Sequence, residues 1–600
     1  NVAVGQGALE SNTTADNNTA VGREALTANT TGADNIAIGI YAMDANTTGA
    51  QNTALGRDAL GANTTATGNT GLGYASLGAN TTGASNVAVG YGSLDANTTA
   101  SNNTAVGYDA LGVNTTGTPN TAFGYNAMAA NTTGTNNVAV GSGALDANTT
   151  ASANTAVGRD ALTTATTAAN NTAIGNYSQG ATTTGASNTS LGSDSMAANT
   201  TGANNIGIGH SALDANTTAS FNVAVGSGSL GANTTGTRNI GMGYVALAAN
   251  TTGSYNVALG ENALGQNTTA ANNTAVGYRT LLVNTTGAGN VAIGRGALDA
   301  NTTASNNVAV GYGAASANTT ATDVVAVGTN ALTANTTGAI NTAVGNFSLD
   351  ANTTGHSNSA LGGYSLTANT TGNYNVAIGR NAMAANTTAS NNVAIGGNSP
   401  LDANTTGDSN VAVGSGNCLG ANTTGANNVG IGNAALSLNT TASKNIGIGT
   451  AALEANTTGI QNVAIGFQSL DANTTAANNT AVGNETMSTN TTGTQNAAFG
   501  TTAMILNTTG SYNTALGPYA LKVNTTGANN TAIGYQALLN SQSGSNLLAL
   551  GKDAGITGSP GGNFVSDSNY VLLGDENITH AYIQVDWTIA SDQRDKTDFT

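Results

Sequence analysis

Short apolar stretches recur along this chain at a fixed interval of 17 residues. In the segment N-I-A-I-G at 35–39, larger aliphatic residues alternate with alanine, which is the period-two pattern of a β-strand. One face of such a strand carries Val, Ile or Thr, and the other carries only a methyl group. The glycine that follows suits a backbone corner where a side chain would clash or φ is positive. Each repeat therefore predicts one short strand that ends at a corner.

The remainder of the repeat predicts a turn and a second inward-facing apolar point. Two variable residues follow the glycine, and then comes an Ala-Leu pair such as Ala25 and Leu26. An A-N-T-T-G segment follows, in which Asn and Gly are turn formers. The glycines, the N-T-T block and the β-branched residues of every repeat oppose a helix. The sequence therefore predicts an all-β fold, a parallel β-solenoid or β-roll built of 17-residue coils.

The repeats define the predicted domains. The glycine slot occurs 33 times between Gly5 and Gly551, which predicts a shaft over residues 1–551. Two coils, which end at Gly414 and Gly432, are one residue longer, and a bulged corner accounts for each of them. The period stops after Gly551, and residues 552–590 predict a β-rich C-terminal cap.

The energetics of a single coil favour assembly. One coil buries few aliphatic side chains while it orders 17 residues, so it needs neighbouring coils and gains from partner chains. The alanine face of the strand suits close approach by another backbone or another chain. The sequence therefore favours a homo-oligomer over a lone solenoid.

Composition excludes several partners and sites. The chain has 12 basic and 29 acidic side chains, a formal net charge of −17, so nucleic acid and anionic membranes are excluded as main partners. A single cysteine excludes an intrachain disulfide framework, and no apolar run approaches the length of a membrane span. The three histidines are far apart, so no metal, cofactor or Ser-His-Asp site is predicted. The chain opens without Met, and we expect it to be a piece of a longer protein.

The Asn-Thr-Thr slot of each coil has three interpretations. The first is a ladder of Asn amides and Thr hydroxyls that bond along the stack. The second is a glycosylation sequon in every coil, and the third is a threonine array that orders ice. An adjacent Thr pair places only one hydroxyl on a given face, which favours the ladder. The candidate glycosylation sites are Asn12, Asn29, Asn46 and Asn63.

The residue after the strand glycine is often Tyr or Arg. These side chains are expected to stand outward in a column, either as a solvated corner with stacked rings or as a stripe that binds sugar or protein. The candidate binding tyrosines are Tyr74, Tyr91, Tyr108, Tyr125, Tyr244, Tyr278, Tyr312 and Tyr535. The arginines of the same column are Arg23, Arg57, Arg159, Arg295 and Arg380.

The strand motif resembles a known family. The segments N-I-A-I-G at 35–39 and N-V-A-I-G at 375–379 are similar to the N-S-V-A-I-G signature of the head repeats in YadA-type trimeric autotransporter adhesins. That resemblance implies a left-handed parallel β-roll that trimerises and binds host matrix or cell surfaces. The coil is three residues longer here than the 14 that is usual in that family.

The last ten residues carry a second resemblance. The segment S-D-Q-R-D-K-T-D at 591–598 resembles the opening of the endosialidase-type intramolecular chaperone of phage tail spikes and fibres. The resemblance implies a domain over 591–600 and beyond that trimerises, assists folding of the shaft and then cuts itself off. Ser591 matches the nucleophile and Lys596 the base, with cleavage between Ala590 and Ser591. A lysine desolvated by packing can lose its proton and activate a hydroxyl.

Two function classes remain. The first is the extracellular shaft of a homotrimeric phage or prophage tail fibre, and the second is a bacterial cell-surface trimeric adhesin that contacts a glycan or protein receptor. About a hundred chaperone-like residues after Thr600 would support the fibre, whereas a coiled coil and membrane β-strands would support the adhesin. An enzyme is not predicted, apart from one self-cleavage event.

Overall fold

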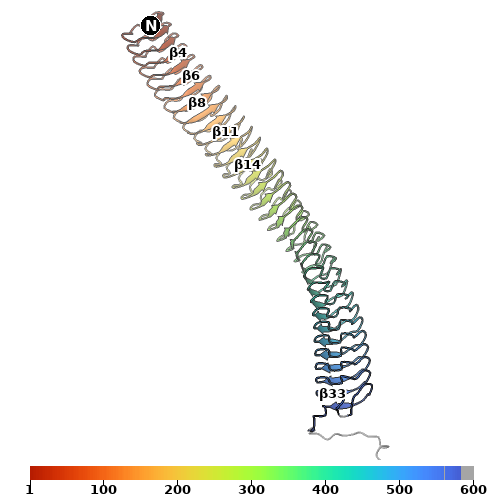
Figure 1. The fold of residues 1–600 in the computed structure, drawn as a ribbon. Coiled ribbons are helices and arrows are strands. Elements are labelled where there is room, and N and C mark those ends of the chain that lie inside the picture. Colours follow the sequence, from red (N-terminus) through yellow and green to blue (C-terminus); the bar gives the residue numbers. More distant parts are fainter. Residues whose placement is uncertain (560, 581, 583–600) are drawn as a thin grey trace, which may run out of the picture. The chain divides into compact units, whose positions relative to one another are not determined.

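The computed structural model describes residues 1–559, 561–580 and 582, in which every regular element is a β-strand. The chain forms two compact units, Asn1–Asn341 and Thr342–Thr600. The 17-residue phrase continues through this boundary, and no change of composition marks it. Figure 1 shows the strands of each unit stacked as successive coils. The predicted parallel β-solenoid is confirmed.

The strands are short and evenly spaced. The first unit contains β1 (Val2–Val4), β2 (Thr19–Val21), β3 (Ile36–Ile38), β4 (Thr53–Leu55), β5 (Thr70–Leu72), β6 (Val87–Val89), β7 (Thr104–Val106), β8 (Asn120–Phe123), β9 (Asn137–Val140), β10 (Thr155–Val157), β11 (Thr172–Ile174), β12 (Thr189–Leu191), β13 (Ile206–Ile208), β14 (Val223–Val225), β15 (Ile240–Met242), β16 (Val257–Leu259), β17 (Thr274–Val276), β18 (Val291–Ile293), β19 (Val308–Val310) and β20 (Val325–Val327). The second unit contains β21 (Thr342–Val344), β22 (Ser359–Leu361), β23 (Val376–Ile378), β24 (Val393–Ile395), β25 (Val411–Val413), β26 (Val429–Ile431), β27 (Ile446–Ile448), β28 (Val463–Ile465), β29 (Thr480–Val482), β30 (Ala497–Phe499), β31 (Thr514–Leu516), β32 (Thr531–Ile533), β33 (Leu548–Leu550) and β34 (Val571–Leu573).

Successive strands pair in parallel, and the repeat sets their register. In the pair β2 and β3, Thr19 lies opposite Ile36, one period further along the chain. The glycine after each strand has a steric reason. Gly39 has a φ of +143°, and a Cβ on it would lie 2.3 Å from the carbonyl oxygen of Gly56. Close stacking of the corners therefore requires glycine, as the sequence predicted.

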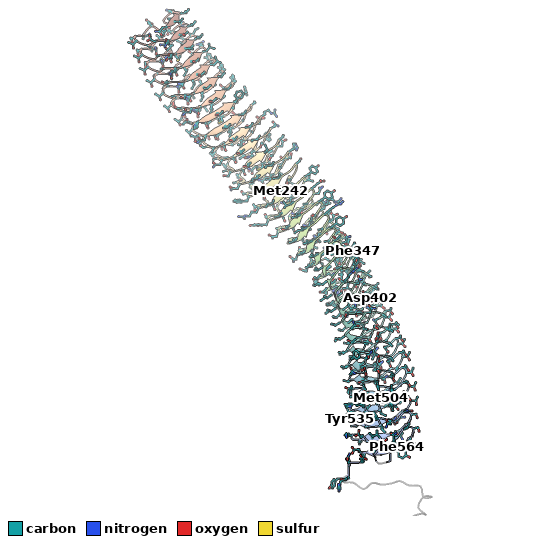
Figure 2. The ribbon with its side chains drawn as sticks, in the orientation of Figure 1. Met242, Phe347, Asp402, Met504, Tyr535 and Phe564 are labelled. Carbon is teal, nitrogen blue, oxygen red and sulfur yellow. The ribbon has the colours of Figure 1, made fainter. Side chains whose placement is uncertain are left out.

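The interior of the coil is lined by alanine and leucine. The strand alanine Ala37 and the Ala42–Met43 pair that follows it are fully buried in one hydrophobic cluster. Leu26 and Leu60 fill the same place in neighbouring coils and are also fully buried. Figure 2 labels Met504, which lies in this core, and Met242, which is 43% exposed on the outer strand face.

The alanine face is enclosed within the solenoid, so of its two expected partners, another backbone or another chain, the second does not apply. The alanines approach the far side of their own coil, so this face is not available to a partner chain. The Val, Ile and Thr face points outward instead, as at Ile36 (42% exposed) and Leu55 (41%). The inside of a 17-residue coil is narrow, and opposite a leucine it admits only the alanine methyl.

The buried leucine adopts an unusual backbone conformation. Leu26 has a φ of 53° and Leu60 a φ of 52°, in the left-handed region that non-glycine residues rarely enter. Such a residue costs about 1–3 kcal/mol and persists only where the surroundings fix it. Here the leucine amide donates to the next coil, as from Leu60 to the carbonyl of Ser76 at 3.0 Å. Core burial and this hydrogen bond therefore hold the strained residue.

Polar ladders run along the stack beside the core. The Nδ2 of Asn46 donates to Oδ1 of Asn29 at 2.8 Å and to the carbonyl of Gly49 at 3.0 Å. The Oγ1 of Thr30 donates to the carbonyl of Thr47 at 3.1 Å. The asparagines just before the strands form a second ladder, in which Asn35 N–H donates to Oδ1 of Asn18 at 2.9 Å. The ladder interpretation of the N-T-T slot is confirmed.

The irregular coils keep the strand register. Val393 of β24 pairs with Val411 of β25, 18 residues on, so the extra residue lies in the corner, where Asn398 and Ser399 have positive φ.

The described part of the predicted cap contributes one strand, β34, which pairs in parallel with β33. It extends the solenoid by one further, longer coil.

Candidate functional site

The predicted outward column of tyrosines is present at the corners after the strands. The eight candidate tyrosines are between 42% exposed, at Tyr278, and 59% exposed, at Tyr244. Their orientation follows from the glycine corner, which ends the strand and directs the next side chain away from the core. The column therefore offers side chains to solvent at regular intervals in each unit.

Four consecutive tyrosines of this column form a stack. Ring centroids lie 5.1 Å apart from Tyr74 to Tyr91 and from Tyr91 to Tyr108, and 5.4 Å apart from Tyr108 to Tyr125, with rings nearly parallel. The ring faces between the tyrosines cover one another, so only ring edges and hydroxyls face solvent. Asp109 raises the pKa of the Tyr108 hydroxyl, with smaller effects of burial and of Tyr91 and Tyr125. A saccharide cannot lie face to face on rings inside the stack.

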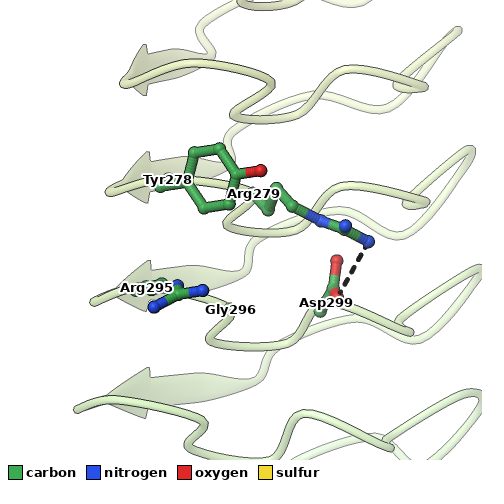
Figure 3. Close-up of a pocket in the computed structure, with 5 residues that line it drawn as sticks. All are labelled: Tyr278, Arg279, Arg295, Gly296 and Asp299. Carbon is green, nitrogen blue, oxygen red and sulfur yellow. Dashed lines mark hydrogen bonds and ion pairs between the residues drawn. The ribbon is translucent and has the colours of Figure 1, made fainter.

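A groove lies where an arginine replaces a tyrosine in the column. The guanidinium of Arg295 lies between the rings of Tyr278 and Tyr312, 5.7 and 5.8 Å from their centroids. Figure 3 shows Arg279 reaching from one coil to Asp299 on the next, where Nη2 and Oδ2 are 3.5 Å apart. An open cavity of about 260 Å³ is lined by Tyr278, Arg279, Arg295, Gly296 and Asp299, but not by Tyr312.

The groove has a net positive charge. Arg279 and Arg295 both line it, whereas Asp299 is its one acidic group. Burial raises the pKa of the Asp299 carboxyl, and the nearby Arg279 opposes that shift. A second hollow of about 390 Å³ shares Arg295, Gly296 and Asp299 with the groove and adds the uncharged polar residues Ser316 and Asn330. The sequence pointed to Tyr278, Tyr312 and Arg295 but not to Arg279 or Asp299.

The candidate glycosylation sites are poorly placed for a glycan. Asn29, Asn46 and Asn63 are fully buried, and each side-chain amide donates two hydrogen bonds. Asn12 is partly exposed, and its amide donates to the carbonyl of Ala15. A sugar on these nitrogens would require the ladder to open, so the folded coil opposes glycosylation.

The threonine pair offers a single exposed row. The first threonine of most pairs is half-buried, and its hydroxyl donates to a carbonyl of the next coil, as at Thr30. The second, such as Thr31 or Thr48, is exposed. One row of hydroxyls does not form a two-dimensional lattice that matches ice.

At a different corner, aspartate side chains lie close to carboxylates of adjacent coils. Burial raises the pKa of Asp44, Asp95 and Asp146, and the nearest carboxylates of adjacent coils add to the shift. The pKa of Asp471 rises to about 6, mainly through burial, with Glu454 and Glu485 contributing. The described residues hold no group of three His, Cys, Asp or Glu side chains arranged to bind a metal ion.

The outer face of the strands is apolar along both units. The last residue of each of the 34 described strands is Val, Ile, Leu, Met or Phe, and no charged residue occupies either outward position. Leu191 is 46% exposed, Phe123 56% and Leu516 48%. We call this row of last strand residues the outer apolar row. Sequence reasoning missed it, although the absence of polar residues from this position in every repeat was the available signal.

Ser591 and Lys596 lie outside the described residues. Cys418 is buried, and burial raises the pKa of its thiol to about 12.

No protein-family model matches the chain, and no curated protein matches it. In the part of the chain that the structure describes, no helix has the length and apolar character needed to cross a bilayer.

Proposed function

We propose that this chain is the structural shaft of a homotrimeric phage or prophage tail fibre, located outside the cell on the virion. Its folding is assisted by a C-terminal chaperone that cuts itself off before Ser591. The proposed role is mechanical, and the one bond-breaking step is that single cleavage.

The outer apolar row is the observation that supports the proposed oligomer. Large contiguous apolar patches on a protein surface mark interaction sites. Val, Ile and Leu at the strand ends are exposed or half-buried in every coil, next to a second outward row in which Thr, Val and Ile predominate. A second solenoid of the same sequence offers a matching row with the same spacing, so copies of this chain are well suited to cover one another.

The number of chains and the biological setting rest on the two resemblances. Heads of YadA type and chaperones of endosialidase type are both trimeric, and a closed three-fold arrangement would bury three outer apolar rows around one axis. The matches at Ser591 and Lys596 favour the tail fibre.

A cell-surface adhesin is the second candidate. The exposed stack from Tyr74 to Tyr125 favours it, because aromatic side chains dominate binding hot spots. In that case the column contacts a glycan or protein receptor while the shaft projects from the cell.

Expression of the chain with its natural downstream residues separates these candidates. The fibre predicts a cleaved product that ends at Ala590, and it predicts that Ser591→Ala and Lys596→Ala each leave the precursor intact. If the wild-type precursor stays uncleaved and its downstream residues form a coiled coil and membrane β-strands, the fibre would be contradicted and the adhesin supported.

A further inference from the structure

The groove around Arg295 is the most distinctive chemical environment on the described surface. The whole chain has only 12 basic side chains, and two of them line this groove from successive coils. Among the described residues, none forms an ion pair or a side-chain hydrogen bond with the Arg295 guanidinium, which lies over the two tyrosine rings. Its donors are therefore available to a ligand.

The second arginine is held in place by its neighbour. Asp299 contacts the Arg279 guanidinium from the next coil, as Figure 3 shows, and 47% of the Arg279 side chain remains exposed. Gly296 keeps the space between the arginines open, because a Cβ built on it meets no atom within 4 Å. The site thus combines two guanidinium groups, an aromatic border and an empty floor.

We propose that this groove binds an acidic saccharide, with the sugar carboxylate between Arg295 and Arg279 and the adjoining sugar in the hollow beside Ser316 and Asn330. The surplus of one positive charge matches one carboxylate per sugar. Arginine binds carboxylates through paired N–H donors. The polar hollow supplies hydroxyl and amide groups that bind sugar hydroxyls, and the ring edges of Tyr278 and Tyr312 contact the C–H groups of the sugar.

The charge pattern disfavours other anions. Nucleic acid is disfavoured because binding of its phosphate backbone needs many clustered basic side chains, whereas the groove offers two arginines on a chain with a net charge of −17. A simple carboxylate would leave the second hollow empty. This site does not depend on the proposed trimer, because its residues follow the corner and do not belong to the outer apolar row.

Calorimetric titration of the whole protein at low salt tests the proposal, with trigalacturonate as the probe. We expect saturable binding in the millimolar range. The methyl-esterified trimer, which lacks the charge, should bind at least about tenfold more weakly, since a charged hydrogen bond is lost at each arginine. Triglutamate, an acidic peptide of equal charge, should also bind more weakly.

Three variants locate the binding. Arg295→Ser should weaken binding about tenfold, and serine occupies the same slot at Ser142. Gly296→Asn should do the same by filling the groove, and Asn381 has the same slot and a φ of 58°, so the backbone tolerates it. Arg238→Ser is the control, because Arg238 also lies between two aromatic rings but has no second arginine beside it.

The outcomes separate cleanly. No saturable binding by the wild type, or equal binding of the methyl ester, would overturn the proposal. Tighter binding of triglutamate would assign the groove to acidic peptides instead. Unchanged binding by Arg295→Ser and Gly296→Asn, or an equal loss in Arg238→Ser, would place the saccharide elsewhere.

Discussion

A natural gap in the asparagine ladder allows its contribution to be measured by repair. Ala165 and Thr182 occupy the ladder slot in two successive coils. Asn148 therefore has no donor above it, and its Oδ1 is buried without a hydrogen-bond partner. On the other side of the gap, the Asn199 Nδ2 still donates to the carbonyl of Gly202 at 3.0 Å, but along the ladder it has only the distant Oγ1 of Thr182, at 3.5 Å. We predict that Ala165→Asn stabilises these coils.

The magnitude follows from the regular coils. The backbone at Ala165 already matches, since its N–H donates to the carbonyl of Leu162 at 3.1 Å, as Asn29 donates to Leu26 at 3.3 Å. The new amide would donate to Asn148 Oδ1 and to the carbonyl of Ala168. A buried unsatisfied acceptor costs about 1–3 kcal/mol. The new Oδ1 would accept from the hydroxyl of Thr182, the ladder residue of the next coil, and after the loss of side-chain freedom we expect a gain of about 1–2 kcal/mol.

Hydrogen exchange is the suitable assay, because a long repeat array opens locally and one global free energy is poorly defined. Amides of the coils between Asn148 and Thr182 should become roughly tenfold better protected, since 1.4 kcal/mol corresponds to a factor of ten. Ala165→Asp has the same shape but no donors, and it should lower protection. Asn46→Ala, which removes a side chain from an unbroken part of the ladder, should also lower the protection of the amides around it. Equal protection in the wild type and in Ala165→Asn would refute the energetic role of the ladder.

Three further predictions concern the corner, the acidic side chains and the outer face. Gly39→Ala should abolish ordered stacking around its coil, seen as fast exchange there, because the new Cβ would lie 2.3 Å from a carbonyl oxygen. The raised pKa of Asp471, about 6, means that the folded state binds this proton more tightly than the unfolded state. Thermal stability should therefore rise as the pH falls from about 7 to about 5, and Asp471→Asn should weaken that dependence, with circular dichroism as the measurement. Leu191→Lys should lower the temperature at which the proposed oligomer dissociates, because the lysine would be buried without a partner in the proposed interface, whereas Tyr91→Lys at the solvated corner should leave that temperature unchanged.

Repetition made most of the coil predictable from the sequence. A position that repeats as Gly, such as Gly39, or as Asn, such as Asn46, is constrained in every copy, and the strand, the corner and the ladder follow from those constraints. The left-handed φ of Leu26 was not predictable, because local propensity disfavours it and only the surrounding coils enforce it.

The direction of the strand faces was harder to predict. Hydrophobicity alone places Ile36 and Ile38 inside and Ala37 outside, whereas the structure does the opposite. The width of the coil decides, and width depends on the whole circuit of 17 residues. The constancy of alanine beside a varying Val, Ile or Thr was the local sign of a tight interior.

The groove illustrates a different limit. The corner slot identified Tyr278 and Arg295, but Arg279 and Asp299 meet only because one coil stacks on the next and the arginine extends across the step. No spacing rule within a single repeat predicts that contact. The catalytic resemblance at Ser591 and Lys596 stays a prediction from sequence.

The native mass of residues 1–600 tests the central claim most directly. The single-chain mass of this segment is 58.3 kDa, so light scattering coupled to size-exclusion chromatography should give three times that value, and the complex should resist SDS without heating. A single-chain mass under native conditions, with the outer apolar row left in solvent, would contradict the trimeric shaft.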